Sequence, residues 1–137
     1  MKEMNRLIWL LLVFPVAIAF ACFRTPTNSD VKKIEIKKVD FDLTSVISVN
    51  CDDFENYFKG EVKTSVIESQ EDLKVFSDYL DTLTKDDEGY VPDVRAKILV
   101  YRSDNGIDTL CMSDLGMVYN GVSMLINSKI LEFVETH

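Results

Sequence analysis

Residues 94–124 constrain the fold more than any other part of this chain, because runs of β-forming residues alternate there with turn signals. Two Asn-Gly pairs, Asn105-Gly106 and Asn120-Gly121, lie between short apolar runs. Asn and Gly tolerate the positive φ angles that tight hairpin turns require. The stretch therefore predicts an antiparallel β-meander, with strands at 94–102, 107–112, 117–119 and 122–124.

The residues before the meander predict further strands. Ile34 and Ile36 share one face of a first strand, and the apolar phase then shifts near Lys37-Lys38, which indicates a bulge or a break. Apolar residues alternate with polar ones over 39–51, which predicts one half-buried strand or two in line. Residues 62–68 predict another strand.

Three helices are expected. A short one covers 52–58, and a longer one follows Ser69, whose hydroxyl is placed to accept hydrogen bonds from the free amides of the first turn. Asn127 is placed to cap a last helix that runs to about Thr136. The order of elements predicts an α+β fold, with a mainly antiparallel sheet packed against two to three helices.

The first 23 residues resemble a targeting segment. Residues 7–23 carry no charge and follow a start that contains Lys2 and Arg6, as in a secretory signal. Cys22 directly follows Ala21 and lies where an acylated lipoprotein cysteine would lie. An uncleaved membrane anchor and a cleaved, lipid-free protein remain open as alternatives. We therefore expect a lipoprotein or anchor segment at 1–22, a polar tether at 23–32 and one α+β domain at 33–137.

The charge balance restricts the classes of partner. The chain has 15 basic and 23 acidic residues, for a net charge of −8. Nucleic acids and anionic lipid headgroups attract clustered Lys and Arg. We therefore expect no nucleic-acid partner, and contact with a membrane only through the N-terminus.

No known catalytic constellation is present in the sequence. The single histidine is His137, the last residue, so no folded imidazole is expected to serve as a base. Nucleotide-binding, zinc-protease and nucleophile-elbow motifs are absent. A pair of carboxylates, as in glycoside hydrolases, remains open because it requires no motif. We expect a protein that is not an enzyme and has no cofactor.

Asp86, Asp87 and Glu88 form the densest group of oxygen ligands. Calcium accepts six to eight such ligands, but the spacing here lacks the pattern of a calcium-binding loop and its distal Glu. We expect a solvated loop and no dedicated metal site.

Cys51 and Cys111 are the other cysteines of the chain. In an exported protein whose Cys22 is lipidated, they form an even number in an oxidising compartment, where a disulfide persists. Two separate buried thiols are the alternative. A disulfide is the hypothesis to test, because the sequence does not supply the distance between them.

The chain resembles small bacterial envelope lipoproteins that have no assigned activity. The resemblance rests on Cys22, the polar tether, and the Asp93-Val94-Arg95, Asp108-Thr109-Leu110-Cys111 and Asn120-Gly121 segments. It implies a location in the bacterial cell envelope and brings no site residues.

These observations favour a membrane-tethered binding or inhibitory module whose partner is a protein or a glycan. A small envelope hydrolase with a carboxylate pair and a structural subunit of an envelope complex are the alternatives. Tyr90, Tyr101 and Tyr119 are candidates for a binding face. Exposed aromatics beside a cleft would favour binding, and a buried acid with a raised pKa would favour the enzyme.

Overall fold

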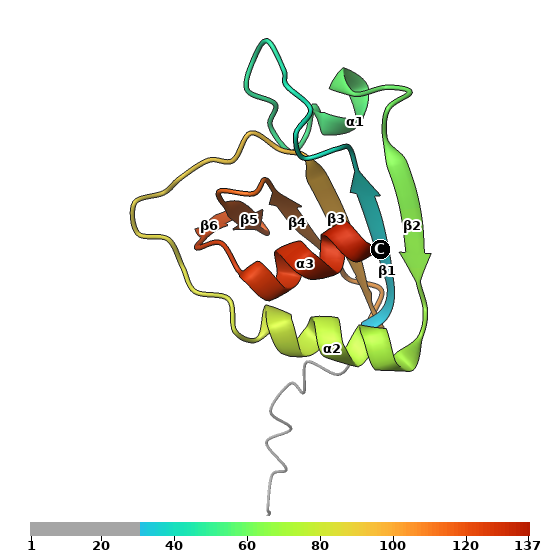
Figure 1. Ribbon diagram of the computed structural model, residues 1–137. Helices are drawn as coiled ribbons and strands as arrows, with labels where there is room; N and C mark the ends of the chain where they lie inside the picture. The colour runs from blue at the N-terminus through green and yellow to red at the C-terminus, as the bar shows by residue number, and fades with distance from the viewer. Residues whose placement is uncertain (1–30) are drawn as a thin grey trace, which may run out of the picture.

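The computed structural model describes residues 31–137, and the predicted lipoprotein or anchor segment lies outside them. Apart from the strand expected over 39–51, the order of elements agrees with the expected one, and the α+β class is confirmed (Figure 1). Within residues 31–137, no helix has the length and apolar character needed to cross a bilayer. The elements are β1 (Val31–Lys38), α1 (Phe54–Tyr57), β2 (Lys63–Ile67), α2 (Gln70–Leu80), β3 (Ala96–Arg102), β4 (Ile107–Met112), β5 (Met117–Tyr119), β6 (Val122–Met124) and α3 (Ser128–Thr136).

The six strands form one antiparallel sheet in the order β2-β1-β3-β4-β5-β6. The predicted meander β3–β6 is confirmed, although β3 begins at Ala96 instead of Val94. Asn105 and Asn120 have φ angles of 67° and 47°, as their hairpin turns require. β1 begins at Val31, so the last two residues of the predicted tether belong to the sheet.

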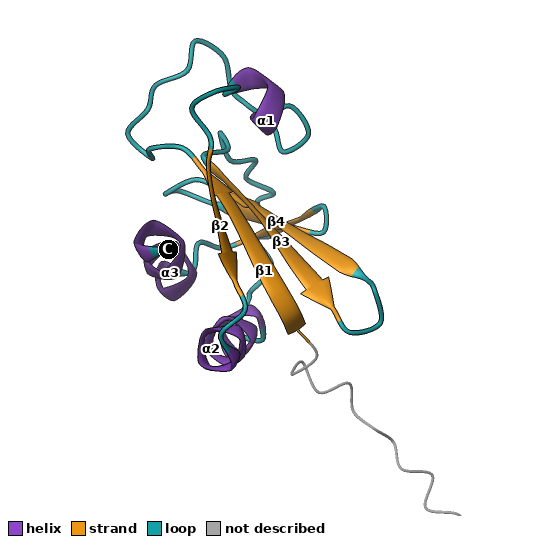
Figure 2. Cartoon of the chain, turned by 90° about the vertical axis from the view of Figure 1, so that its right-hand side faces the viewer, coloured by secondary structure: helices purple, strands orange, loops and turns teal. Residues whose placement is uncertain are grey.

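Helices α2 and α3 cover one face of the sheet, and Figure 2 shows them side by side on that face. Because strand side chains alternate between faces, Ile34, Ile36, Ile98 and Leu110 point together towards the helices and are fully buried. Burial of these side chains supplies the main driving force for folding. The helices add several buried apolar residues to this main core, namely Leu73, Phe76, Leu80, Ile130, Phe133 and Val134.

The helix ends are capped as the sequence predicts. The Ser69 side chain accepts from the Asp72 amide, and the Asn127 side chain accepts from the amides of Lys129 and Ile130. The C-terminal end of α3 has a cap that was not predicted from the sequence. Lys38 of β1 donates to two carbonyl oxygens of the last turn of α3, at 2.7 and 2.8 Å. A cation at the negative end of the helix dipole stabilises α3 against the sheet.

The prediction of a strand over 39–51 is wrong. β1 ends at Lys38, where the phase of the apolar residues shifts, and residues 39–53 form turns and loop. Val39 and Val49 are buried in a second, smaller core, whereas Val46 and Ile47 between them are exposed. The alternation therefore reflects a loop attached near its two ends, where the Val39 amide donates to the Arg95 carbonyl at 2.9 Å and the Val94 amide donates to the Val49 carbonyl at 2.8 Å.

The second core fastens the loop and α1 to the sheet. Phe54 of α1 and Phe58, which directly follows α1, are buried there beside Cys111 of β4, and their rings meet edge to face at 5.6 Å. The Cα atoms of Cys51 and Cys111 lie 5.7 Å apart, a separation that a disulfide spans.

Candidate functional site

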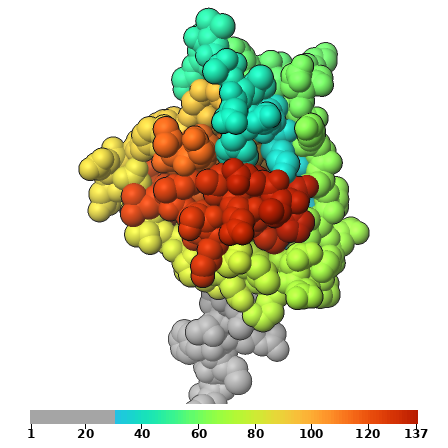
Figure 3. All heavy atoms as spheres, viewed as in Figure 1, coloured from blue at the N-terminus to red at the C-terminus, as the bar shows by residue number. Residues whose placement is uncertain are grey.

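Exposed apolar side chains concentrate in the loops at one end of the sheet. Val46 is 97% exposed, Leu115 is 69% exposed and Val91 is 67% exposed. Such side chains cost free energy in water unless a partner covers them. In the space-filling view, the loop after β1 projects from the top of the molecule (Figure 3). We call the following six residues the loop surface: Val46, Ile47, Tyr57, Tyr90, Val91 and Leu115.

Contacts between the loops make this surface continuous. The amide of Val46 donates to the Tyr57 hydroxyl at 3.2 Å, and Ser45 donates to the Asp93 carboxylate at 3.1 Å. The ring of Tyr90 lies directly over Gly116, where a Cβ atom would collide with it. The loops of residues 39–50, 88–93 and 113–116 are therefore neighbours at one end of the sheet.

A buried arginine ties the loop of residues 39–50 to residues 93 and 94. Arg95 is only 6% exposed, and its guanidinium donates to the carbonyl oxygens of Leu43 and Val94 at 2.8 and 3.0 Å. It also donates to the Ser45 hydroxyl at 3.0 Å and to both carboxylate oxygens of Asp93, at 2.9 and 2.7 Å. A guanidinium with this many acceptors holds the loop in one geometry.

Asp93 completes this arrangement from the other side. Its carboxylate accepts from the amide of Val49 at 2.7 Å as well as from Arg95. Burial acts to raise the pKa of Asp93, but these hydrogen bonds outweigh it and hold the pKa below its usual value. Val46 and Ile47 are therefore presented on a loop that these hydrogen bonds hold in place, which lowers the entropy lost when a partner binds.

The sheet face opposite α2 and α3 is a competing surface, but its own side chains pair across it. Glu55 of α1 contacts Lys37 at 2.8 Å and Lys97 at 3.3 Å, and Lys37 also contacts Glu35 at 3.4 Å. The hydrogen bond from Lys37 is the main cause that lowers the pKa of Glu55. This pairing is typical of a solvated face that solubilises a sheet.

A second cluster of charged and polar side chains links β3, β4 and β5 at the end of the sheet away from the loop surface. Arg102 and Tyr119 both donate to the Asp108 carboxylate, at 2.7 and 2.8 Å, and Asn120 donates to its other oxygen at 2.9 Å. Burial acts to raise the pKa of Asp108, and the hydrogen bonds lower it below its usual value. These groups satisfy one another, so the cluster has a structural explanation.

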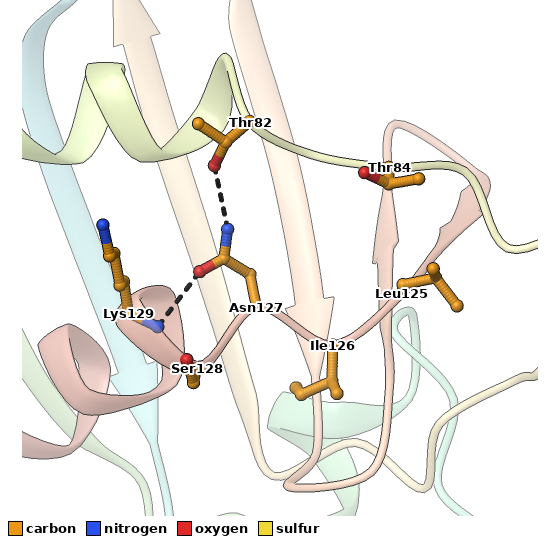
Figure 4. A pocket seen from close by; sticks show the side chains of 7 residues that line it. All are labelled: Thr82, Thr84, Leu125, Ile126, Asn127, Ser128 and Lys129. Carbon is orange, nitrogen blue, oxygen red and sulfur yellow. Dashed lines mark hydrogen bonds between the residues drawn. The ribbon is translucent and has the colours of Figure 1, made fainter.

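A hollow of about 380 Å³ lies where α2 ends and α3 begins (Figure 4). Polar groups that line this hollow form hydrogen bonds with one another and with the backbone. The Asn127 side chain donates to the Thr82 hydroxyl at 3.0 Å and accepts from the amide of Lys129 at 3.0 Å. The lining residues are Thr82, Thr84, Leu125, Ile126, Asn127, Ser128 and Lys129.

The predicted acidic cluster is part of a turn. Asp86 accepts from the amides of Glu88 and Tyr90, each at 3.0 Å. Across residues 31–137, no group of three or more His, Cys, Asp or Glu is arranged to hold a metal ion.

The three candidate tyrosines do not form one face. Tyr119 packs against the main core, and Tyr101 lies on the opposite face, where Lys33 sits 3.9 Å from the centre of its ring. Tyr90 alone belongs to the loop surface.

Sequence reasoning missed the ion pair between the buried Arg95 and the half-buried Asp93, although one signal was present. Arg95 interrupts an apolar run at the start of a strand and follows Asp93 by two residues. A charged residue at a position of strand burial requires a partner, and the nearest acid supplies it.

No model of a protein family, no curated protein and no solved structure matches this chain.

Proposed function

We propose that this protein is a membrane-tethered binding or inhibitory module of the cell envelope, and that the loop surface docks its protein partner. The observation that carries the proposal is the set of exposed apolar side chains on adjoining loops, of which the loop of residues 39–50 is held by hydrogen bonds to Arg95 and Asp93. Solvent-exposed apolar side chains that are fixed in place are typical of recognition surfaces, because binding then costs little ordering entropy.

The position of the loop surface supports a tethered arrangement. β1 begins at Val31 at one end of the sheet and runs towards the loops at the other end (Figure 1). An eight-residue strand spans about 26 Å. A chain held at a membrane through the residues before Val31 would therefore present the loop surface away from that membrane.

Site-specific photo-crosslinking in the producing cells tests this function. A photoreactive amino acid replaces Val46 in the full chain, and a matched variant carries it at Val66, which is exposed on β2. We expect one discrete adduct from position 46 and none from position 66, because only the loop surface contacts the partner.

The substitution L115D supplies the specificity control, because it places a charge in the same apolar surface about 70 residues away in the chain. We expect it to abolish the adduct at position 46. An adduct that persists in this variant, or that forms equally from position 66, would contradict docking at the loop surface.

A further inference from the structure

We infer that the partner presents an apolar contact surface surrounded by Lys and Arg. This inference rests on the proposed function and deepens it, since it states the chemistry of the partner. It follows from the charge of the loops that carry the loop surface.

These loops contain acids and no bases. Residues 39–58 hold five Asp and Glu, residues 86–93 hold four and residues 113–116 hold one, whereas Lys, Arg and His are absent from all three segments. The whole chain has 15 basic residues, so they are concentrated elsewhere. The end of the molecule with the loop surface therefore has a locally negative potential.

Most of these carboxylates are not neutralised by a neighbour. Asp93 pairs with Arg95, Glu55 pairs with two lysines of the sheet, and Asp87 pairs with Lys85 at 3.9 Å. Within residues 31–137, no ion pair involves the exposed acids that flank the loop surface most closely in sequence, which are Asp42, Glu88 and Asp114.

The sign of this potential selects among the possible occupants. A second copy of the chain would place two acidic ends against each other, and an anionic lipid surface would be repelled in the same way. A protein with a basic rim around an apolar centre matches both properties of the surface. Apolar contacts would then supply most of the affinity, and the charges would set the selectivity and the rate of association.

Defined peptides test this chemistry with the full chain in a non-ionic detergent. One immobilised peptide alternates Lys with Leu, a second alternates Glu with Leu, and a third alternates Lys with Ser. Biolayer interferometry measures binding of the protein to each. We expect binding to be strongest for the Lys-Leu peptide and absent for the Glu-Leu peptide.

Substitutions in the loop surface locate the binding. The variant V46S/V91S/L115S is expected to bind the Lys-Leu peptide at least about tenfold more weakly, because it removes the apolar contact area. The matched variant V66S/I107S/V122S removes three exposed apolar side chains from the strands β2, β4 and β6, and is expected to bind as the wild type does.

Charge substitutions test whether the acids around the loop surface contribute to binding of a basic partner. D42N/E88Q/D114N is expected to weaken binding to the Lys-Leu peptide, and E71Q/D81N/E132Q, which removes the same number of charges from the helices and their ends, is expected to leave it unchanged. Raising the salt from ~50 to ~300 mM is expected to weaken binding by the wild type about tenfold, and to have a smaller effect on D42N/E88Q/D114N.

Three outcomes would overturn the inference. The Glu-Leu peptide binds as well as the Lys-Leu peptide; the two charge variants behave alike; or the full chain self-associates through the loop surface. If position 46 still crosslinks to a partner in cells under any of these outcomes, docking at the loop surface stands and only the basic character of the partner is wrong.

Discussion

Arg95 is the residue on which the candidate site depends most. A buried guanidinium is stable only when acceptors surround it, and the loop of residues 39–50 wraps around it to supply them. The sequence shows the Asp93-Val94-Arg95 triplet but not its partners, because Leu43 and Ser45 lie about 50 residues away. Long-range contacts of this kind leave no periodic pattern in a sequence.

The substitution R95K tests this dependence. Lysine keeps the charge but lacks the planar guanidinium with its several N–H donors, so it cannot donate hydrogen bonds to Leu43, Ser45 and Asp93 together. We expect the free energy of unfolding to fall by about 1–3 kcal/mol in urea denaturation. The exposed pair of Lys74 and Asp78 supplies the control, and K74A is expected to cost less than about 0.5 kcal/mol. Equal effects of the two substitutions would contradict the role of Arg95.

Stability should decrease in acid because three carboxyl groups have lowered pKa values. Hydrogen bonding from Lys37 lowers the pKa of Glu55, and hydrogen bonds outweigh burial at Asp93 and Asp108. A pKa that is lower in the folded state than in the unfolded state adds stability above the unfolded pKa of about 4, and that stability is lost as the pH falls through the folded value.

We therefore expect the free energy of unfolding to fall between about pH 5 and pH 2, with a shallower slope in D93N than in the wild type. Urea denaturation across this range measures both slopes. The exposed acid Glu71 provides the control, and E71Q is expected to keep the wild-type slope. A D93N slope that equals the wild-type slope would show that Asp93 has no lowered pKa.

At the scale of the elements, the sequence predicted those helices and turns that are specified by residues close to them in the chain. The two Asn-Gly turns, the Ser69 and Asn127 caps and the helix stripes lie within a few residues of the elements they specify. The segment 39–51 was misassigned because Val39 and Val49, near its two ends, are buried by long-range contacts with residues such as Val94, Cys111 and Phe54, whereas Val46 and Ile47 are exposed. The loop surface was missed for the same reason.

The cysteines connect this loop to the sheet. With their Cα atoms 5.7 Å apart, we predict that Cys51 and Cys111 form a disulfide after export. It would close a loop of 60 residues, for a stabilisation of about 3–4 kcal/mol on the chain-entropy model. Reduction is therefore expected to lower the melting temperature.

Thiol counting on a C22S variant measures the bond directly. When this protein is unfolded without reductant, we expect no free thiol. Two free thiols would mean that Cys51 and Cys111 are separate core residues.

At the scale of the whole molecule, β1 begins at the end of the sheet opposite to the loop surface. We expect the wild-type chain to incorporate a fatty-acid analogue and C22S to lose that label, because Cys22 directly follows the apolar segment and Ala21. If the wild-type chain incorporates no fatty-acid analogue but still fractionates with membranes, the uncleaved anchor is favoured instead.

Hydroxyl-radical footprinting tests most directly whether the loop surface is covered in its native setting. The full chain is labelled in intact cells and again after purification, and oxidation is quantified by mass spectrometry at Val46, Val91 and Leu115. Val66 and Ile107, which are exposed outside the loop surface, serve as references. The proposed function predicts protection in cells at the three loop residues and none at the references. Equal oxidation of the loop residues in both samples would contradict it.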